Sequence, residues 1–343
     1  MNFFKIIILF EIFTTILSAQ TYSIEELVRQ GVELHEQGKY NEAIKKYEEA
    51  LKIDENSALA NLEMAVTCLS LELYDYATKY ATIALVEATE DRIKMGAYLV
   101  LGSVLEKRNL PLEAVNVYEE AIQLFPHNFD LYYKLAVQAI KLEDFEKGET
   151  AIISSIKENS AFPEPYLILN DLMLRKKARI KAMFSIYYFL MLEPDSPAAQ
   201  IYLKLLLSLF TYEGDVKYFG NSNTHAHLFI NMNEREFSSA EALLHMTFYN
   251  KTIEYKDKEA KTLEFFMEMT KEFFQIVKNS SQNSDGFWWE NFVNKFADIL
   301  TTNNLEPFCY YISQSLNSPE VQKWIENNQE KIDALRLWID LNK

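Results

Sequence analysis

The sequence contains few of the residues that make tight turns. Its 343 residues include only 8 glycines and 8 prolines, whereas an all-β fold needs turn residues about every ten positions. Hydrophobic residues make up 49% of the chain, enough for one large core or two ordinary ones. We therefore expect an all-α protein in which short loops join long helices.

Cysteine is nearly absent as well. The only two, Cys68 and Cys309, lie far apart and form neither a C-x-x-C pair nor a disulfide framework. We expect both to be buried free thiols, which is the commoner state. A single long-range disulfide is the less favoured alternative.

Positive charge is also scarce. The chain carries 50 acidic and 34 basic residues, for a formal net charge of −16. Such a surface repels phosphate backbones and anionic lipids, which argues against nucleic acid and membrane surfaces as partners.

Residues 1–19 have the pattern of a signal peptide. Lys5 supplies a basic start, an apolar run covers residues 6–17, and Ser18 and Ala19 provide a small-residue exit. The run is too short to span a bilayer core of about 30 Å. We expect cleavage before Gln20, with an N-terminal helix docked on the fold as the alternative. The residue directly after the cut is Gln20 and not cysteine, so the expectation is a periplasmic or secreted protein, not a lipoprotein, without a stable membrane span.

The middle of the chain repeats with a period of 34 residues. The segments NEAIKKYEEAL and LEAVNVYEEAI align, and a three-residue insertion near Asp91 interrupts the register once. The register defines five repeats: 24–57, 58–91, 95–128, 129–162 and 163–196. The eighth place is small in four repeats and Asn170 in the fifth, and the twentieth is always Gly or Ala.

This pattern resembles the tetratricopeptide-repeat family over about half of the chain. The resemblance implies helix–turn–helix pairs, close-packed at the small residues, that stack into an α-solenoid superhelix. It also implies that the first helices line a concave groove that binds a protein or peptide.

The places that face the groove in this family are mainly apolar in the middle of the stack. The family's carboxylate clamp for chaperone tails requires Lys, Arg or Asn where this chain has Val28, Val32 and Leu62, so we predict that the clamp is absent. An open groove and one covered by the C-terminal half are equally favoured. The predicted partner-binding residues are Leu62, Val66, Leu69, Leu99, Tyr133, Val137 and Ile140. The basic run RKKARIK, residues 175–181, is expected to be a solvated turn in preference to a docking site for an acidic peptide.

The C-terminal half, 197–343, reads as a capping helix followed by a helical domain rich in aromatic residues. A loop or small β-hairpin is predicted near 216–234. Helical spacing favours Trp288 and Trp289 as core residues over a carbohydrate-stacking site. The segments FWWENFVNKFADIL and EPFCYYISQS resemble the C-terminal part of exported repeat proteins of Bacteroidetes-type bacteria. That resemblance implies a location and an architecture and no particular chemistry.

No catalytic motif is present. Phosphate loops, G-x-S-x-G and H-E-x-x-H are all missing, and His225-x-His227 lacks a third clear ligand, so loop histidines are favoured over a metal site. We expect no cofactor and no enzymatic activity. The leading hypothesis is an interaction scaffold outside the cytoplasm, and the alternative is a glycan or nutrient binding module that uses the C-terminal aromatics.

Overall fold

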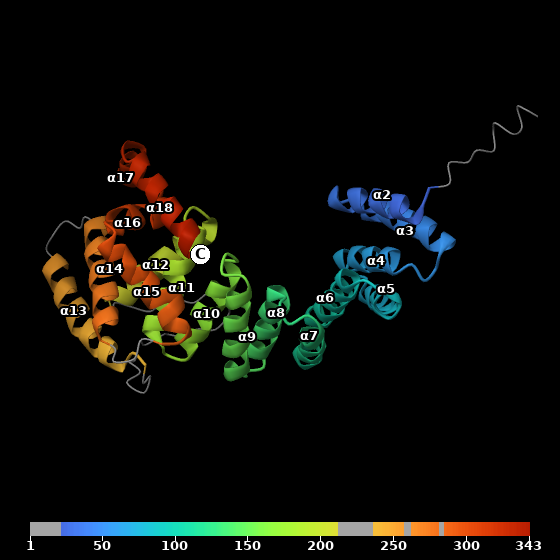
Figure 1. Ribbon diagram of the computed structural model, residues 1–343, viewed down its shortest axis with the longest axis horizontal. Coiled ribbons are helices and arrows are strands. Elements are labelled where there is room, and N and C mark those ends of the chain that lie inside the picture. Colours follow the sequence, from blue (N-terminus) through green and yellow to red (C-terminus); the bar gives the residue numbers. More distant parts are fainter. Residues whose placement is uncertain (1–21, 212–235, 257–261, 281–284) are drawn as a thin grey trace, which may run out of the picture. The chain divides into compact units, whose positions relative to one another are not determined.

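The computed structural model describes residues 22–211, 236–256, 262–280 and 285–343 (Figure 1). Every regular element in these ranges is a helix, which confirms the predicted all-α fold class. None of the described helices is both long enough and apolar enough to cross a membrane. The expected signal peptide, the hairpin near 216–234 and the pair His225 and His227 lie outside the described residues.

Ten consecutive helices form five antiparallel pairs, and the third pair begins at Asp91, before the predicted start of its repeat at residue 95. Within each pair, three residues separate the first helix from the second. The pairs are α2 (Ile24–Glu36) with α3 (Tyr40–Ile53), α4 (Ala58–Ser70) with α5 (Tyr74–Glu87), α6 (Asp91–Lys107) with α7 (Pro111–Leu124), α8 (Phe129–Lys141) with α9 (Phe145–Glu158), and α10 (Glu164–Arg175) with α11 (Arg179–Leu192).

One turn geometry recurs in all five pairs. The residue after the C-cap adopts a positive φ, at +74° for Gly38 and near +60° for its four counterparts, which are Glu72, Asn109, Glu143 and Lys177. The next amide donates a hydrogen bond to the carbonyl five residues back, as from the Lys39 N–H to the Leu34 carbonyl at 2.9 Å. This Schellman motif ends the first helix and reverses the chain.

The residue at the close contact in each first helix is smallest where its neighbour in the second helix is largest. A Cβ atom added at Gly31 would lie 2.3 Å from the ring of Tyr47, and one added at Gly102 would lie 2.3 Å from the ring of Tyr118. In the repeats that carry alanine at this place, the residue that aligns with Tyr47 and Tyr118 is smaller than tyrosine. Ala65, for example, has Ala81 at the aligned position. Glycine therefore occurs where a tyrosine ring must lie against the first helix.

The three-residue insertion lengthens a helix and leaves the turn intact. Helix α6 has 17 residues, whereas α2, α4 and α8 have 13 each. The extra turn lies at its N-terminus and includes Arg92 and the buried Ile93.

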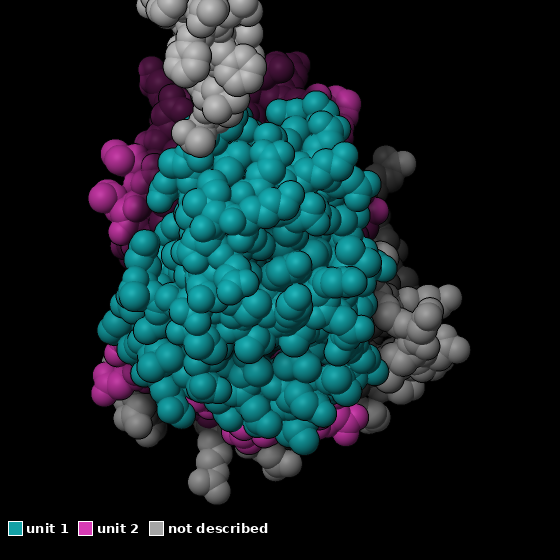
Figure 2. Space-filling view, turned by 90° about the vertical axis from the view of Figure 1, so that its right-hand side faces the viewer, with its two compact units in different colours: residues 1–127 teal, residues 128–343 magenta. Residues whose placement is uncertain are grey.

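The chain divides into two compact units after His127, shown in teal and magenta in Figure 2. Unit 1 contains the first three helix pairs. Unit 2 contains the last two pairs together with the C-terminal helices, so the division falls within the predicted run of repeats. These later elements are α12 (Pro197–Thr211), α13 (Ser238–Lys256), α14 (Thr262–Asn279), the π-helix Trp289–Val293, α15 (Asn294–Thr301), α16 (Leu305–Ile312), the 3-10 turn Gln314–Leu316, α17 (Pro319–Asn327) and α18 (Gln329–Asn342).

Helix α11 forms the centre of unit 2. It is buried on every side, unlike the second helices of unit 1, because α10, α12, α16 and the π-helix all contact it. The Phe184 ring lies 4.9 Å from Phe273 and 5.8 Å from Phe296. The Tyr187 hydroxyl pairs with that of Thr270 at 2.8 Å. A helix that is apolar on all sides must be buried by neighbouring elements on all sides, and the C-terminal helices bury the faces of α11 that α10 leaves open.

Candidate functional site

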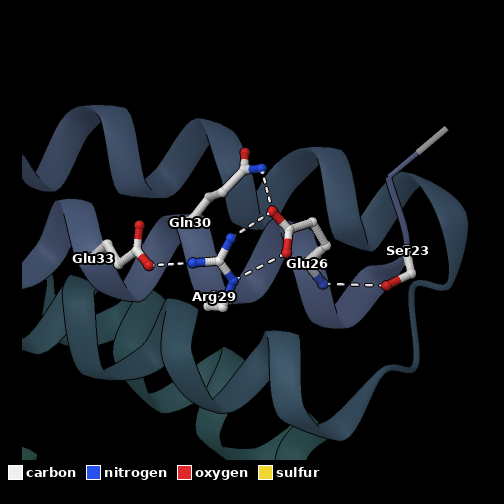
Figure 3. A network of polar contacts seen from close by, with 5 residues as sticks. All are labelled: Ser23, Glu26, Arg29, Gln30 and Glu33. Carbon is white, nitrogen blue, oxygen red and sulfur yellow. Dashed lines mark hydrogen bonds and ion pairs between the residues drawn. The ribbon is translucent and has the colours of Figure 1, made fainter. Parts of the chain in front are cut away.

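The first helices of unit 1 carry the surface that a partner would meet if the repeats bind as their family resemblance implies. Helix α2 begins at Ile24 because the Ser23 hydroxyl accepts a hydrogen bond from the Glu26 N–H at 3.2 Å. Beyond this cap, Arg29 binds both Glu26, at 2.7 Å, and Glu33 (Figure 3). Hydrogen bonds from Arg29 and Gln30 lower the pKa of Glu26. Arg29 is thus engaged by its own helix.

A polar contact ties α2 to α4. His35 Nδ1 lies 2.8 Å from the Thr67 hydroxyl, which is fully buried between the helices. The His35 ring also meets Tyr40 edge-on at 5.0 Å between centroids. This contact therefore helps hold the first two repeats together.

The predicted groove residues of unit 1 differ in their exposure. Leu62 is only 5% exposed, and its side chain lies against Gly96 of α6. Val66, Leu69 and Leu99 are half-buried. We call these three residues the first-helix patch. Leu62 joins neighbouring repeats, whereas the patch residues keep accessible apolar surface.

Acidic groups lie beside the patch. Glu63 precedes Val66 by one helical turn, and burial raises the pKa of its carboxyl group while nearby Arg92 opposes that effect. Arg92 belongs to the extra turn of α6, so the insertion brings a basic group close to Glu63. Glu106, further along α6, accepts a hydrogen bond from the Tyr118 hydroxyl at 2.7 Å. Sequence reasoning missed Glu63 and Arg92, although the insertion itself was the signal.

The predicted groove residues of unit 2 lie on α8. Tyr133, Val137 and Ile140 are all half-buried. The Tyr133 ring meets Phe162 edge-on at 5.5 Å, and Ile140 lies against Gly148 of α9. Two of the three therefore support the local packing of their own unit.

The basic run 175–181 is only partly the solvated turn that was expected, since Arg175 and Lys177 are exposed but the rest of the run is not. Arg179 is 3% exposed and binds Glu241 of α13 at 2.8 Å and the Leu209 carbonyl at 3.2 Å. Lys181 pairs with Glu236 at 2.9 Å, and Lys176 pairs with Glu146 at 2.8 Å. Acidic groups of the same unit therefore already occupy these cations, which also weakens the acidic-peptide alternative.

The tryptophans on which the glycan alternative depended are core residues. Trp288 is 5% exposed and Trp289 is 2% exposed. Trp288 stacks on Phe292 at 4.9 Å, and Trp289 stacks on Phe237 at 5.9 Å. Neither ring offers a free face for a sugar.

The described residues contain no group of three or more His, Cys, Asp or Glu side chains placed to hold a metal ion. Cys68 and Cys309 are both free and buried, as predicted. Within the described ranges, the site thus consists of apolar and acidic surface on helices.

Comparisons with known proteins identify the repeats. Residues 31–70 match a family model described as "TPR repeat", and residues 96–128 match one described as "Tetratricopeptide repeat". None of the curated proteins matches the chain.

Several solved structures share the helical arrangement over part of the chain. MamA from Desulfovibrio magneticus RS-1 is 19% identical with a TM-score of 0.44, covering 50% of this chain and 94% of its own. PilF from Pseudomonas aeruginosa is 18% identical with a TM-score of 0.47, covering 68% and 95%. YrrB, described as a TPR protein with an unusual peptide-binding site, is 17% identical with a TM-score of 0.43, covering 56% and 95%.

The two family matches fall on the helix pairs of unit 1. They include Gly31 and Gly102, the positions against which the tyrosine rings lie. The matched segments, residues 31–70 and 96–128, are tetratricopeptide repeats.

Proposed function

We propose that this protein is a non-enzymatic interaction scaffold that binds a peptide or helical segment of another protein through the first-helix patch. Tetratricopeptide repeats generally mediate protein–protein interactions. The observation that carries the proposal is the apolar surface that the partly buried Val66, Leu69 and Leu99 keep on neighbouring first helices.

The surroundings of the patch define the chemistry of the partner. Apolar side chains would fill the patch, and basic side chains would complement Glu63 and the net charge of −16. Arg29 is paired with Glu26 and Glu33, which disfavours recognition of an acidic tail at α2. We therefore favour an apolar segment with flanking lysines or arginines.

A matched pair of variants tests this proposal. The double variant Val66→Asp/Leu69→Asp places two charges in the patch, whereas Val86→Asp changes a 73%-exposed residue on α5, a second helix. Affinity capture from envelope extracts should recover the same partner with the wild type and Val86→Asp and lose it with the double variant. Undiminished recovery with the double variant, when circular dichroism shows it folded, would refute the patch as the binding site.

We further propose that the protein acts outside the cytoplasm, in the periplasm or as a secreted protein. The sequence pattern of residues 1–19 supports this location. Mass spectrometry of the protein from its own cells should give a chain that begins at Gln20. A chain that retains residues 1–19 would contradict export by this route.

A further inference from the structure

Helix α13 carries apolar residues on both of its faces. Its inner face contributes Ala240, Leu244 and Phe248, each no more than 1% exposed, and the Phe248 ring meets Phe210 edge-on at 5.0 Å. The buried pair of Glu241 and Arg179 adds to this attachment. These contacts fix which face of α13 points into unit 2.

The opposite face presents a row of large apolar side chains to solvent. Leu243 is 51% exposed, Met246 65%, Tyr249 60% and Ile253 54%. Their spacing of three, three and four residues places them along one side of the helix over about three turns. We call these four residues the α13 stripe. In Figure 1, α13 lies at the outside of the C-terminal helices, next to α14.

A stripe of this kind is unusual on a surface helix. The outward face of such a helix is normally polar, and exposed apolar residues are normally scattered singly. Four side chains of this size, each more than half exposed, present roughly 400–500 Å² of apolar surface, which is the size of a functional patch on a monomer. The stripe is also separate from the first-helix patch, because it belongs to unit 2 and to an element outside the repeats.

We propose that the α13 stripe is a homodimer interface in which two copies of this chain pack α13 against α13. A two-fold contact requires a surface that complements itself, and an all-apolar stripe does so because every residue meets another apolar residue. Two stripes together remove on the order of 1,000 Å² from water, the lower bound for a specific interface. The dimer is therefore a weak one that forms at micromolar concentrations.

The charges at the edge of the stripe disfavour an acidic partner. Lys251 binds Glu254 at 3.2 Å and also binds Glu268 of α14. These three groups together carry a net charge of −1, so the edge does not attract an acidic surface. Because each copy has a net charge of −16, long-range repulsion opposes the dimer and added salt screens that repulsion. Dimerisation should accordingly strengthen as salt rises.

Sedimentation velocity of the full chain over about 1–100 µM tests the proposal. The wild type should shift from monomer to dimer, and the shift should occur at lower protein concentration in 500 mM than in 50 mM NaCl. Met246→Glu should remain monomeric. Leu337→Glu, which changes a residue of α18 that is 63% exposed, is the matched control and should still dimerise.

A cross-linking experiment gives a positive readout. Met246→Cys should form a disulfide-linked dimer under mild oxidation, whereas Leu337→Cys should not, and the buried Cys68 and Cys309 should stay reduced in both. A wild type that is monomeric at 100 µM would overturn the proposal, with the stripe then covered by this chain itself or by another protein. Equal loss of the dimer in Met246→Glu and Leu337→Glu would overturn it as well.

Discussion

Both compact units contain helix pairs of the same type, but they bury the second helix of the pair to different extents. In unit 1, second helices such as α3 bury only Ala43, Tyr47 and Ala50 and leave a charged face in water. In unit 2, the equivalent helix α11 is buried from Arg179 to Met191 except at Lys181. The repeat geometry is therefore compatible both with an open stack and with a closed globule. The side chains on the outer face of the second helix decide between them.

The polar contacts of the two units differ in how far apart in the sequence their residues lie. Polar side-chain contacts that join helices in unit 1 bridge neighbouring repeats, as between His35 of α2 and Thr67 of α4. Those of unit 2 connect distant parts of the chain, since Arg179 meets Glu241 and the Tyr188 hydroxyl meets the Asn342 carbonyl at 3.3 Å. Solenoid repeats depend on their neighbours, whereas a globular core depends on all of its parts together.

Removal of a central ring should have the largest effect on this contrast. Phe184→Ala leaves a cavity among Phe273, Phe292 and Phe296 and should lower the free energy of unfolding of unit 2 by about 4 kcal/mol. Hydrogen exchange followed by mass spectrometry should show faster exchange in α11 and α14 and unchanged exchange in α4. Equal acceleration in α4 would mean that the two units unfold together.

The buried ion pair should give the next largest effect. Glu241→Gln leaves the Arg179 charge uncompensated inside unit 2 and should cost about 3 kcal/mol, at the lower end of the usual range because the amide oxygen still accepts a hydrogen bond. Urea unfolding measures the loss. The double variant Arg179→Met/Glu241→Leu should recover most of it, since an apolar pair removes the unpaired charge. A double variant as unstable as the single one would disprove this explanation.

A glycine substitution tests the close packing in unit 1. Gly102→Ala forces the rigid ring of Tyr118 aside and should destabilise unit 1 by about 2 kcal/mol. Gly96→Ala in the same helix is the matched control, because its new Cβ meets only the tip of the Leu62 side chain, 2.9 Å away, and alanine favours the helix. Thermal unfolding should rank Gly102→Ala well below Gly96→Ala. Equal melting temperatures would contradict the proposed role of the ring.

The turns should give the smallest effect, with opposite sign. The left-handed backbone at Glu72 and Glu143 costs about 1–2 kcal/mol for an ordinary residue, and glycine removes this cost. The larger backbone entropy that glycine loses on folding offsets part of the gain, so Glu72→Gly and Glu143→Gly should each stabilise their unit by about 0.5 kcal/mol. Asn109→Gly is the control and should gain less, because asparagine tolerates this conformation. Denaturant midpoints measure the difference. A loss of stability in Glu72→Gly or Glu143→Gly would contradict the repeated turn geometry.

Local signals in the sequence predicted the helices well. The period of 34 residues, with Ala43 and Tyr47 matched by Ala114 and Tyr118, predicted helix pairs because each pair is specified by small residues and turns close in sequence. The burial of the two thiols also followed from residue type. The insertion near Asp91 was recognised, but its effect, a longer α6 with Arg92 near Glu63, required the structure.

Contacts between distant residues were harder to predict. Nothing near Arg179 indicates that its partner is Glu241, because many acidic residues could have paired with it. The series RIKAMFSIYYFLML in α11 does contain a signal, since it has no charge after Lys181, and this pattern would have predicted a fully enclosed helix. Asn170 also has an explanation: its side-chain amide donates a hydrogen bond to the Ala182 carbonyl at 3.1 Å. A buried amide thus replaces the usual small residue.

The two thiols that form no disulfide give each unit its own chemical probe. Cys68 belongs to α4 in unit 1 and Cys309 to α16 in unit 2, and both are buried. Burial raises the pKa of both thiols, that of Cys68 to about 11, so little of the reactive thiolate exists in the folded protein at neutral pH. Alkylation of either residue therefore reports the opening of the unit that contains it. The unmodified chain can thus show in one labelling experiment which of its halves opens first.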